Sequence, residues 1–188
     1  MSDRVPPGQH LVSNFPVLHM GSVPAFDPTT WRLRVFGLVA EDRRYTYGEI
    51  TTGTLFPVHT VQTDFHCVTT WSKLDNTWEG IRFADLAAHA QIQPATQYVM
   101  AHGAQGYTTN IPLADLLRDD VLLAWRHNGA DLSPDHGYPL RLMVPHLYAW
   151  KSAKWLRGLE FLADDAPGFW EQRGYHMYGD PWREQRYS

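Results

Sequence analysis

The sequence predicts an α+β fold made of many short, mixed β-strands with a few short helices. Three observations favour this class. Apolar and polar residues alternate over short runs, glycine and proline interrupt the 188-residue chain often (14 Gly and 13 Pro), and few segments carry apolar residues at helical spacing. A chain of this length can bury roughly 70% of its unfolded surface in one core. We therefore expect residues 1–188 to form a single domain.

The first part of the chain contains three predicted segments. Residues 1–30 carry five prolines and predict an extended lead-in along the surface. Alternation predicts a strand over 31–39, and the Val-, Thr- and Phe-rich run 58–68 predicts a second strand with Cys67 near its end. We expect a loop over 69–80 that holds Trp71 and Trp78.

The second part alternates short helices and strands. Apolar residues at helical spacing predict a helix that starts at Phe83, and Pro112 marks the start of another short helix. Asn128-Gly129 is typical of a tight turn. Residues 164–188 lack a period, and their aromatic side chains predict a tail packed on the body. The predicted strands are 98–101, 107–111, 121–126, 138–144 and 155–162.

Composition excludes some classes of partner. The chain has 16 Lys and Arg against 20 Asp and Glu, a formal charge of -4, so no global positive field attracts nucleic acid. We find no apolar run of about 18 residues, which a membrane-spanning helix would need. The first ten residues are polar and do not resemble an export signal, so we expect a cytoplasmic protein that binds neither nucleic acid nor membrane.

Cys67 is the only cysteine, which excludes an internal disulfide and a CxxC metal site. An isolated cysteine is most often a small buried apolar residue. Its position where a strand meets a loop also suits a thiolate ligand for a soft metal. A cysteine hydrolase that pairs Cys67 with a histidine remains an alternative. The ten histidines lie on separate segments without the spacing of a zinc site.

A second group of residues predicts an anion site. Arg141 interrupts the apolar run Leu140 to Val144, and two of the three lysines follow closely, at 151 and 154. A buried guanidinium needs an anion or a carboxylate. Together Arg141, Ser152 and Lys154 could hold a phosphate. The alternative is a structural arginine–carboxylate pair beside surface lysines.

These motifs, in this order, resemble the molybdopterin-binding domain of the sulfite oxidase superfamily, and most closely the small bacterial sulfite oxidase-like oxidoreductases. The matching segments cover nearly the whole chain. They are Val23-Pro24, Asp27-Pro28, Trp31-Arg32-Leu33, Gly37, Cys67 to Ser72, Gly106-Tyr107, Ile111-Pro112-Leu113, His136-Gly137, Pro139, Arg141, Lys154-Trp155-Leu156 and Gly168 to Trp182.

The resemblance implies a molybdenum–molybdopterin cofactor and a role for each matching residue. Cys67 would be the protein thiolate on molybdenum, and Tyr107 would lie beside the oxo group, where a phenol can donate a proton. The pterin phosphate would bind Arg141, Ser152 and Lys154. The remaining expected cofactor-binding residues are Asn14, His19 and His136.

Two departures from the family pattern guide the expected activity. Val17 and Leu18 stand where sulfite oxidases have Arg and Asn, and neutral residues 69–71 replace arginines after the metal cysteine. We therefore expect oxygen-atom transfer with reduction of a small S- or N-oxide, in a pocket lined by Trp71, Trp78 and Tyr107. Sulfite oxidation and non-catalytic cofactor binding remain alternatives. No haem-binding segment is recognisable, so we expect a separate electron-transfer partner.

Overall fold

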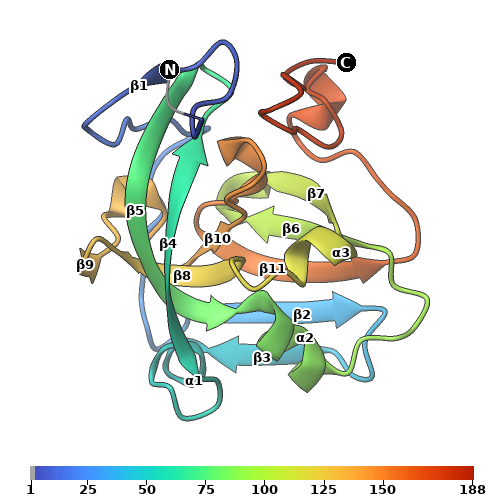
Figure 1. Cartoon of the computed structure of the whole chain (residues 1–188). Coiled ribbons are helices and arrows are strands. Elements are labelled where there is room, and N and C mark those ends of the chain that lie inside the picture. Colours follow the sequence, from blue (N-terminus) through green and yellow to red (C-terminus); the bar gives the residue numbers. More distant parts are fainter. Residues whose placement is uncertain (1–2) are drawn as a thin grey trace.

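The structure, a computed structural model, describes residues 3–188, and two β-sheets dominate it (Figure 1). The first sheet has the strand order β3-β2-β11-β6-β7, and the second has the order β1-β5-β8-β10, with β4 also paired to β5 and β9 to β8. The first sheet comprises β2 (Arg32–Gly37), β3 (Arg43–Thr46), β6 (Tyr98–Gly103), β7 (Thr108–Pro112) and β11 (Leu156–Leu162). The second comprises β1 (His10–Leu11), β4 (Val58–His66), β5 (Trp71–Arg82), β8 (Leu122–His127), β9 (Ala130–Asp131) and β10 (Arg141–Met143).

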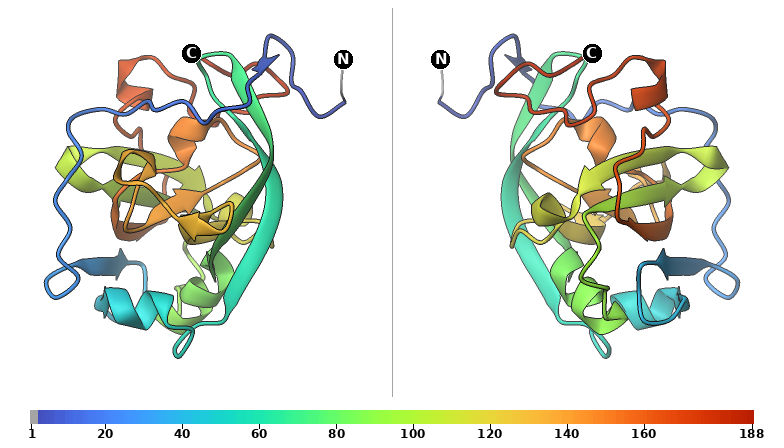
Figure 2. Two further views of the ribbon diagram at one scale, coloured as in Figure 1. Left: turned by 90° about the vertical axis from the view of Figure 1, so that its left-hand side faces the viewer. Right: turned by 90° about the vertical axis from the view of Figure 1, so that its right-hand side faces the viewer.

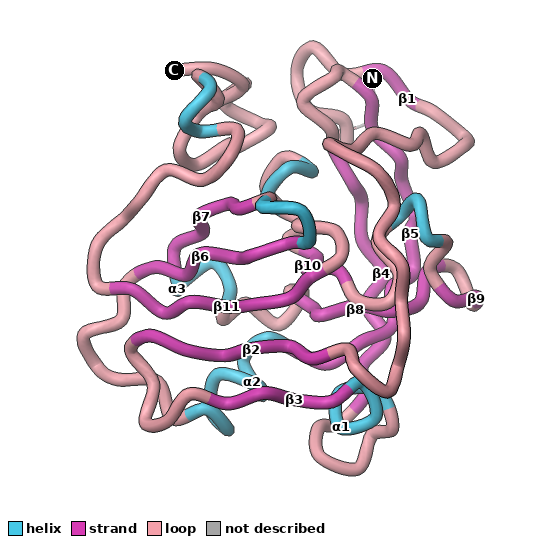
Figure 3. The backbone as a smooth tube through the Cα atoms, turned by 180° about the vertical axis from the view of Figure 1, so that it is seen from behind, coloured by secondary structure: helices cyan, strands magenta, loops and turns pink. Residues whose placement is uncertain are grey.

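Helices are few and short, as Figure 3 shows. They are α1 (Tyr47–Thr51), α2 (Phe83–Ala90) and α3 (Leu113–Leu116), with 3-10 turns η1 (Ala104–Gly106), η2 (Pro134–His136), η3 (Ala149–Lys151) and η4 (Glu171–Arg173). Every apolar residue that predicted the helix beginning at Phe83 is buried in α2, because one apolar face packs on the core. The expected α+β class is confirmed. Within residues 3–188, no helix is long and apolar enough to cross a membrane.

The core divides into two clusters. The larger one fills the space between the sheets with fully buried side chains such as Leu33, Leu123 and Phe161. The smaller one contains Phe65 and Cys67 beneath the turn between β4 and β5. A long β4–β5 hairpin runs along one side of the molecule and brings this turn between the two ends of the chain (Figure 2).

The expectation of a loop over 69–80 is wrong, because most of this segment forms the strand β5. Polar residues along this segment suggested a loop, yet β5 pairs with β1, β4 and β8. Gly80 shows how closely the strands approach: a Cβ there would stand 2.2 Å from the carbonyl oxygen of Leu123. The strand expected over 138–144 shortens to β10, since η2 and Pro139 precede it and Pro139 has no N–H to donate.

The expected tight turn at Asn128-Gly129 agrees with the structure. Asn128 and Gly129 both have positive φ, 49° and 80°, and join β8 to β9 in a tight hairpin turn. The lead-in beyond residue 2 is extended apart from β1, and the aromatic C-terminal segment lies against the body. Residues 1 and 2 of the expected lead-in lie outside the described residues.

Candidate functional site

Cys67 lies in the tight turn that joins β4 to β5. Its backbone N–H donates to the carbonyl of Trp71 over 2.9 Å, and the N–H of Thr70, which has φ 73°, donates to the carbonyl of Cys67 over 3.1 Å. Both ends of the chain hold this turn, since Gln9 donates to the Cys67 carbonyl and Arg186 to that of Val68. The hairpin and the two chain ends therefore fix the position of the thiol.

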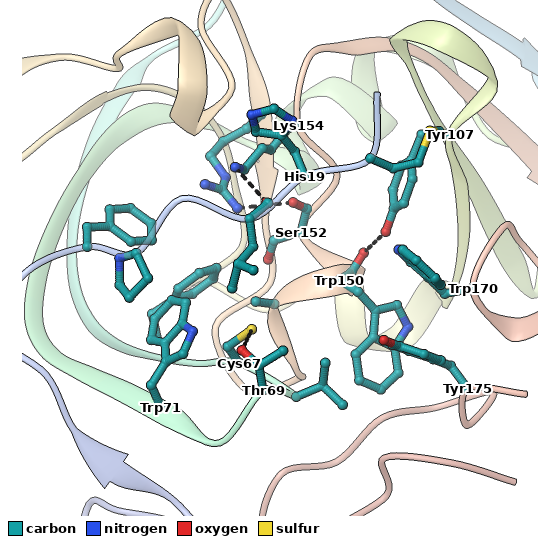
Figure 4. Close-up of a pocket in the computed structure, with 18 of the residues that line it drawn as sticks. His19, Cys67, Thr69, Trp71, Tyr107, Trp150, Ser152, Lys154, Trp170 and Tyr175 are labelled. Atoms are coloured by element: carbon teal, nitrogen blue, oxygen red, sulfur yellow. Dashed lines mark hydrogen bonds between the residues drawn. The ribbon is translucent and has the colours of Figure 1, made fainter. Parts of the chain in front are cut away.

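The Sγ of Cys67 faces a cavity of about 360 Å³ (Figure 4). Burial raises the pKa of the thiol, while a hydrogen bond of 3.2 Å from the Thr69 hydroxyl opposes this rise. The cavity is lined by Phe15, Pro16, Leu18, His19, Met20, Phe65, Cys67, Val68, Thr69, Trp71, Tyr107, Arg141, Ala149, Trp150, Ser152, Lys154, Trp155, Trp170 and Tyr175. None of these lining residues is acidic.

Arg141 supplies a buried positive charge to one wall of the cavity. It is 1% exposed, and its two terminal nitrogens donate to the carbonyls of His136 and Ser152 over 2.9 and 3.2 Å. Its Nε has no hydrogen-bond partner among the described residues. Burial lowers the pKa of Arg141 to about 10, so it stays charged at neutral pH. Rings of Phe15, Phe65 and Trp78 surround the guanidinium at 5.2 to 6.0 Å.

Lys154 shares this wall. Its Nζ donates to the carbonyls of Leu18 and Asp135 over 3.0 and 2.6 Å. The third N–H of the ammonium is therefore left to bind another group. Burial, and after it the positive charge of Arg141, lower the pKa of Lys154 to about 7. The buried Ser152 hydroxyl accepts a hydrogen bond from the N–H of Val144 over 2.9 Å. Two basic groups thus meet here, and none of the described residues that line the cavity is a carboxylate.

Tyr107 lies on the opposite side of the cavity from Trp71 (Figure 4). Its hydroxyl donates to the carbonyl of Trp150. Burial raises the pKa of Tyr107 well above its ordinary value, and Glu171 adds to this rise. The phenol is therefore neutral, and its single proton points at the protein backbone.

The structure brings most of the predicted site residues together. His19, Cys67, Tyr107, Arg141, Ser152 and Lys154 all line the cavity. Asn14 is exposed and does not line it. His136 also lies outside, because its Nε2 meets the carbonyl of Phe15 at 3.1 Å and its ring stacks on that side chain, with centroids 4.1 Å apart.

The expectation that Trp78 lines the pocket is wrong. Trp78 is 0% exposed within the smaller core cluster, because β5 points it inward beneath Phe15. Sequence reasoning missed Trp150, Trp170 and Tyr175, which do line the cavity. The resemblance of the C-terminal segment to the family was the signal that could have found the last two.

Residues 20–170 match the family described as the oxidoreductase molybdopterin binding domain. The chain belongs to this family. Its expected cofactor, molybdopterin with molybdenum, and its oxidoreductase class are thereby confirmed, as is the resemblance to the sulfite oxidase superfamily.

The relatives differ in the share of their own length that this chain covers. The uncharacterized oxidoreductase YuiH of Bacillus subtilis is 50% identical over 188 residues, which are 100% of this chain and 93% of YuiH. Two relatives are 29% identical over 81% of this chain: an Azospira oryzae protein provisionally named protein-methionine-sulfoxide reductase subunit YedZ1, and chicken sulfite oxidase. The chain covers only 57% and 39% of those two proteins.

Among solved structures, the sulfane dehydrogenase SoxCD of Paracoccus pantotrophus has the same fold. The TM-score is 0.71 at 24% identity, over 79% of this chain and 42% of the SoxCD chain.

The residues of the cavity fit the molybdopterin cofactor of the family. A thiol suits a soft metal, and the buried Arg141, with its unpartnered Nε and no acidic neighbour on the cavity wall, suits an anionic group such as a phosphate. The third N–H of Lys154 is available for the same anion. Thiol and cations line one continuous cavity, as a cofactor with a metal end and a phosphate end requires.

Proposed function

We propose that this domain uses its molybdenum cofactor for two-electron oxygen-atom transfer, in the direction that reduces a small neutral S- or N-oxide. When bound, the cofactor supplies the redox chemistry. For an S-oxide the balance is R2SO + 2e⁻ + 2H⁺ → R2S + H2O. The electrons come from a separate electron-transfer protein, which we also propose as a partner. The observation that carries this proposal is that Arg141 and Lys154, which we assign to the cofactor, are the only arginine and lysine among the described residues that line the cavity, and no acidic residue joins them.

The charged side chains of the cavity share one wall, and both act electrostatically on Cys67. Arg141 and Lys154 lie on the wall that we assign, with Ser152, to the pterin phosphate. Around Cys67 the lining residues are neutral, including Thr69, Trp71 and Tyr175. A neutral oxide can enter such a site with little loss of hydration, whereas an anion needs positive groups to offset that loss.

Arginines elsewhere in the chain could have supplied the missing charge, but they do not reach the cavity. Arg126 pairs with Glu79 at 2.9 Å, and Arg173 lies over the ring of Phe169, with its Cζ 3.7 Å from the centroid. Neither residue lines the cavity. The name of chicken sulfite oxidase keeps sulfite oxidation as the second candidate function, and this geometry disfavours it.

In this proposal the protein residues hold and orient the cofactor, and they keep water out of the cavity. We propose Cys67 as the thiolate ligand and His19 as a group that contacts the cofactor. The Tyr107 proton must leave the Trp150 carbonyl before the phenol can donate to a substrate oxygen. Asn14 and His136 could act on the cofactor only indirectly, His136 through its contact with Phe15.

The expected alternative of a cysteine hydrolase finds less support. A cysteine hydrolase needs an activated thiolate, yet burial raises the pKa of Cys67, and the neighbouring His66 is bound to Ser72 at 2.8 Å. Non-catalytic cofactor binding would use the same cavity, and turnover measurements separate it from catalysis. The cytoplasmic location and the lack of nucleic-acid and membrane partners stay predictions.

Steady-state kinetics on protein loaded with molybdenum tests the proposal. We expect turnover of sulfoxides or N-oxides with a chemically reduced dye, and a kcat/KM that exceeds the value for sulfite oxidation. Molybdenum analysis of the same samples normalises the rates. A kcat/KM for sulfite above that of every neutral oxide, with strong salt dependence, would contradict the proposal, and oxide turnover by metal-free protein would exclude the cofactor as its source.

A further inference from the structure

We infer that the C-terminal segment 168–175 determines substrate specificity, because Trp170 and Tyr175 offer an aromatic wall to a substrate with a planar ring beside its reducible oxide. This inference rests on the proposed function and names the substrate class of the same site.

The two rings form one surface. Their centroids are 5.0 Å apart with 24° between the planes, and both line the cavity while remaining partly exposed. Phe169 meets Trp170 edge-on at 5.1 Å, and Trp150 meets Tyr175 edge-on at 5.1 Å. These contacts fix the stacked pair from both sides. In Figure 4 the pair lies across the cavity from Trp71.

Buried polar contacts anchor the segment that carries the two rings. Glu171, next to Trp170, accepts from Lys151 over 2.7 Å, from Thr109 over 3.0 Å and from the Trp150 indole over 2.9 Å. Lys151 also donates to the carbonyl of Met177 over 2.6 Å, beyond Tyr175. The stretch that carries the two rings is therefore anchored next to Trp170 and again beyond Tyr175.

Close backbone contact seats the same segment on β7. A Cβ at Gly168 would stand 2.5 Å from the Thr108 carbonyl oxygen and 2.6 Å from the Cα of Thr109. The N–H of Phe169 donates to that carbonyl over 2.8 Å. Because the attachment is rigid, Trp170 and Tyr175 present a preformed surface, which favours binding of a flat group.

The chemistry of the wall selects the ligand. Stacked aromatic side chains attract planar apolar groups through offset stacking and burial of ring surface. The cations of the cavity lie on the separate wall of Arg141 and Lys154. An aryl or heteroaryl sulfoxide or N-oxide should therefore bind better than a small aliphatic oxide.

Binding measurements with two sulfoxides test the inference independently of turnover. We would titrate molybdenum-loaded protein with methyl phenyl sulfoxide and with dimethyl sulfoxide. For Trp170→Leu we expect the dissociation constant of the phenyl compound to rise about threefold to tenfold, and that of dimethyl sulfoxide to change less than twofold. Trp170→Phe keeps a ring and should recover most of the binding.

Trp182→Leu is the matched control, because Trp182 follows residues 168–175 in the C-terminal part of the chain, is 48% exposed and does not line the cavity. It should leave both dissociation constants unchanged, with equal molybdenum content in all variants. Equal weakening of both sulfoxides in Trp170→Leu, or no weakening of either, would overturn the inference. Ring-selective binding without sulfoxide turnover would support the aromatic wall and refute the reductase activity.

Discussion

Arg141 and Lys154 place two basic groups on one wall of the cavity, and no carboxylate lines that cavity among the described residues, although Asp135 raises the pKa of Lys154 from nearby. Lys154 is affected more, since burial and the neighbouring guanidinium bring its pKa to about 7. An anion bound at this wall would stabilise the charged form of both residues. The first two predictions follow from this arrangement.

The cofactor-free protein should become more stable as the pH rises from 7 to 9. The folded-state pKa of Lys154 is about 7, below its ordinary 10.5. Between these values the unfolded chain binds more protons than the folded one, so the free energy of unfolding increases with pH. Urea denaturation at several pH values measures this slope. Lys154→Met should remove part of it, and an identical slope in the variant would contradict the assigned pKa.

Arg141→Ala and Lys154→Ala should each lower cofactor occupancy under limiting molybdate. Each removes a charged hydrogen bond that contributes about 1.5 to 3 kcal/mol. Turnover per bound molybdenum should change little. Arg34→Ala, at an exposed pair with Asp42, is the control. Full occupancy in the double variant would place the phosphate elsewhere.

Cys67→Ser should keep the fold and much of the pterin but lose reversible molybdenum redox chemistry. A serine hydroxyl is a harder and far less acidic ligand than a thiol. Circular dichroism tests the fold, pterin fluorescence after release tests the organic part, and electron paramagnetic resonance tests the metal. An active variant with an unchanged spectrum would exclude Cys67 as the ligand.

Lys151→Met should destabilise the protein by roughly 3 to 5 kcal/mol, because it leaves the buried carboxylate of Glu171 without its cation. Both side chains of this pair are 0% exposed. The double variant Lys151→Met with Glu171→Leu should be less destabilised than the single one. Arg118→Met, at the exposed pair with Asp120, should cost less than about 1 kcal/mol. Equal losses in both single variants would argue against a buried ion pair.

Local patterns in the sequence predicted most elements correctly. Alternation indicated the strands on either side of the core, and helical spacing indicated α2. The failure at 69–80 has a physical cause: β5 is a strand with neighbours on both sides, and its polar residues are accommodated by partners far away in the chain. Asn76, for example, is buried and pairs with His127 at 3.0 Å. No local pattern reports such a partner.

The site could be predicted where one short motif carries it, as with Cys67 and the stretch from Arg141 to Lys154. Trp170 and Tyr175 could be found only through the resemblance of the C-terminal segment to the family, because no local pattern shows the contact of Glu171 with Lys151 that helps to place them at the cavity. Trp78 shows the opposite error. Its place near the cysteine in the sequence suggested the cavity, but strand alternation points it into the core.

The close approach of Gly168 to β7 has a consequence for how such a domain can diversify. The thiol lies on a hairpin and the cations lie on the β10–β11 stretch, whereas the aromatic wall belongs to the separate segment 168–175, which this glycine seats on β7. Substitutions at Trp170 and Tyr175 can therefore alter what enters the cavity without changing Cys67, whereas Arg186 has to stay because it holds the thiol turn at Val68. An engineer could exchange residues 168–175 between relatives while keeping Gly168 and Glu171, and each exchange would sample a new ligand preference on a constant cofactor-binding body.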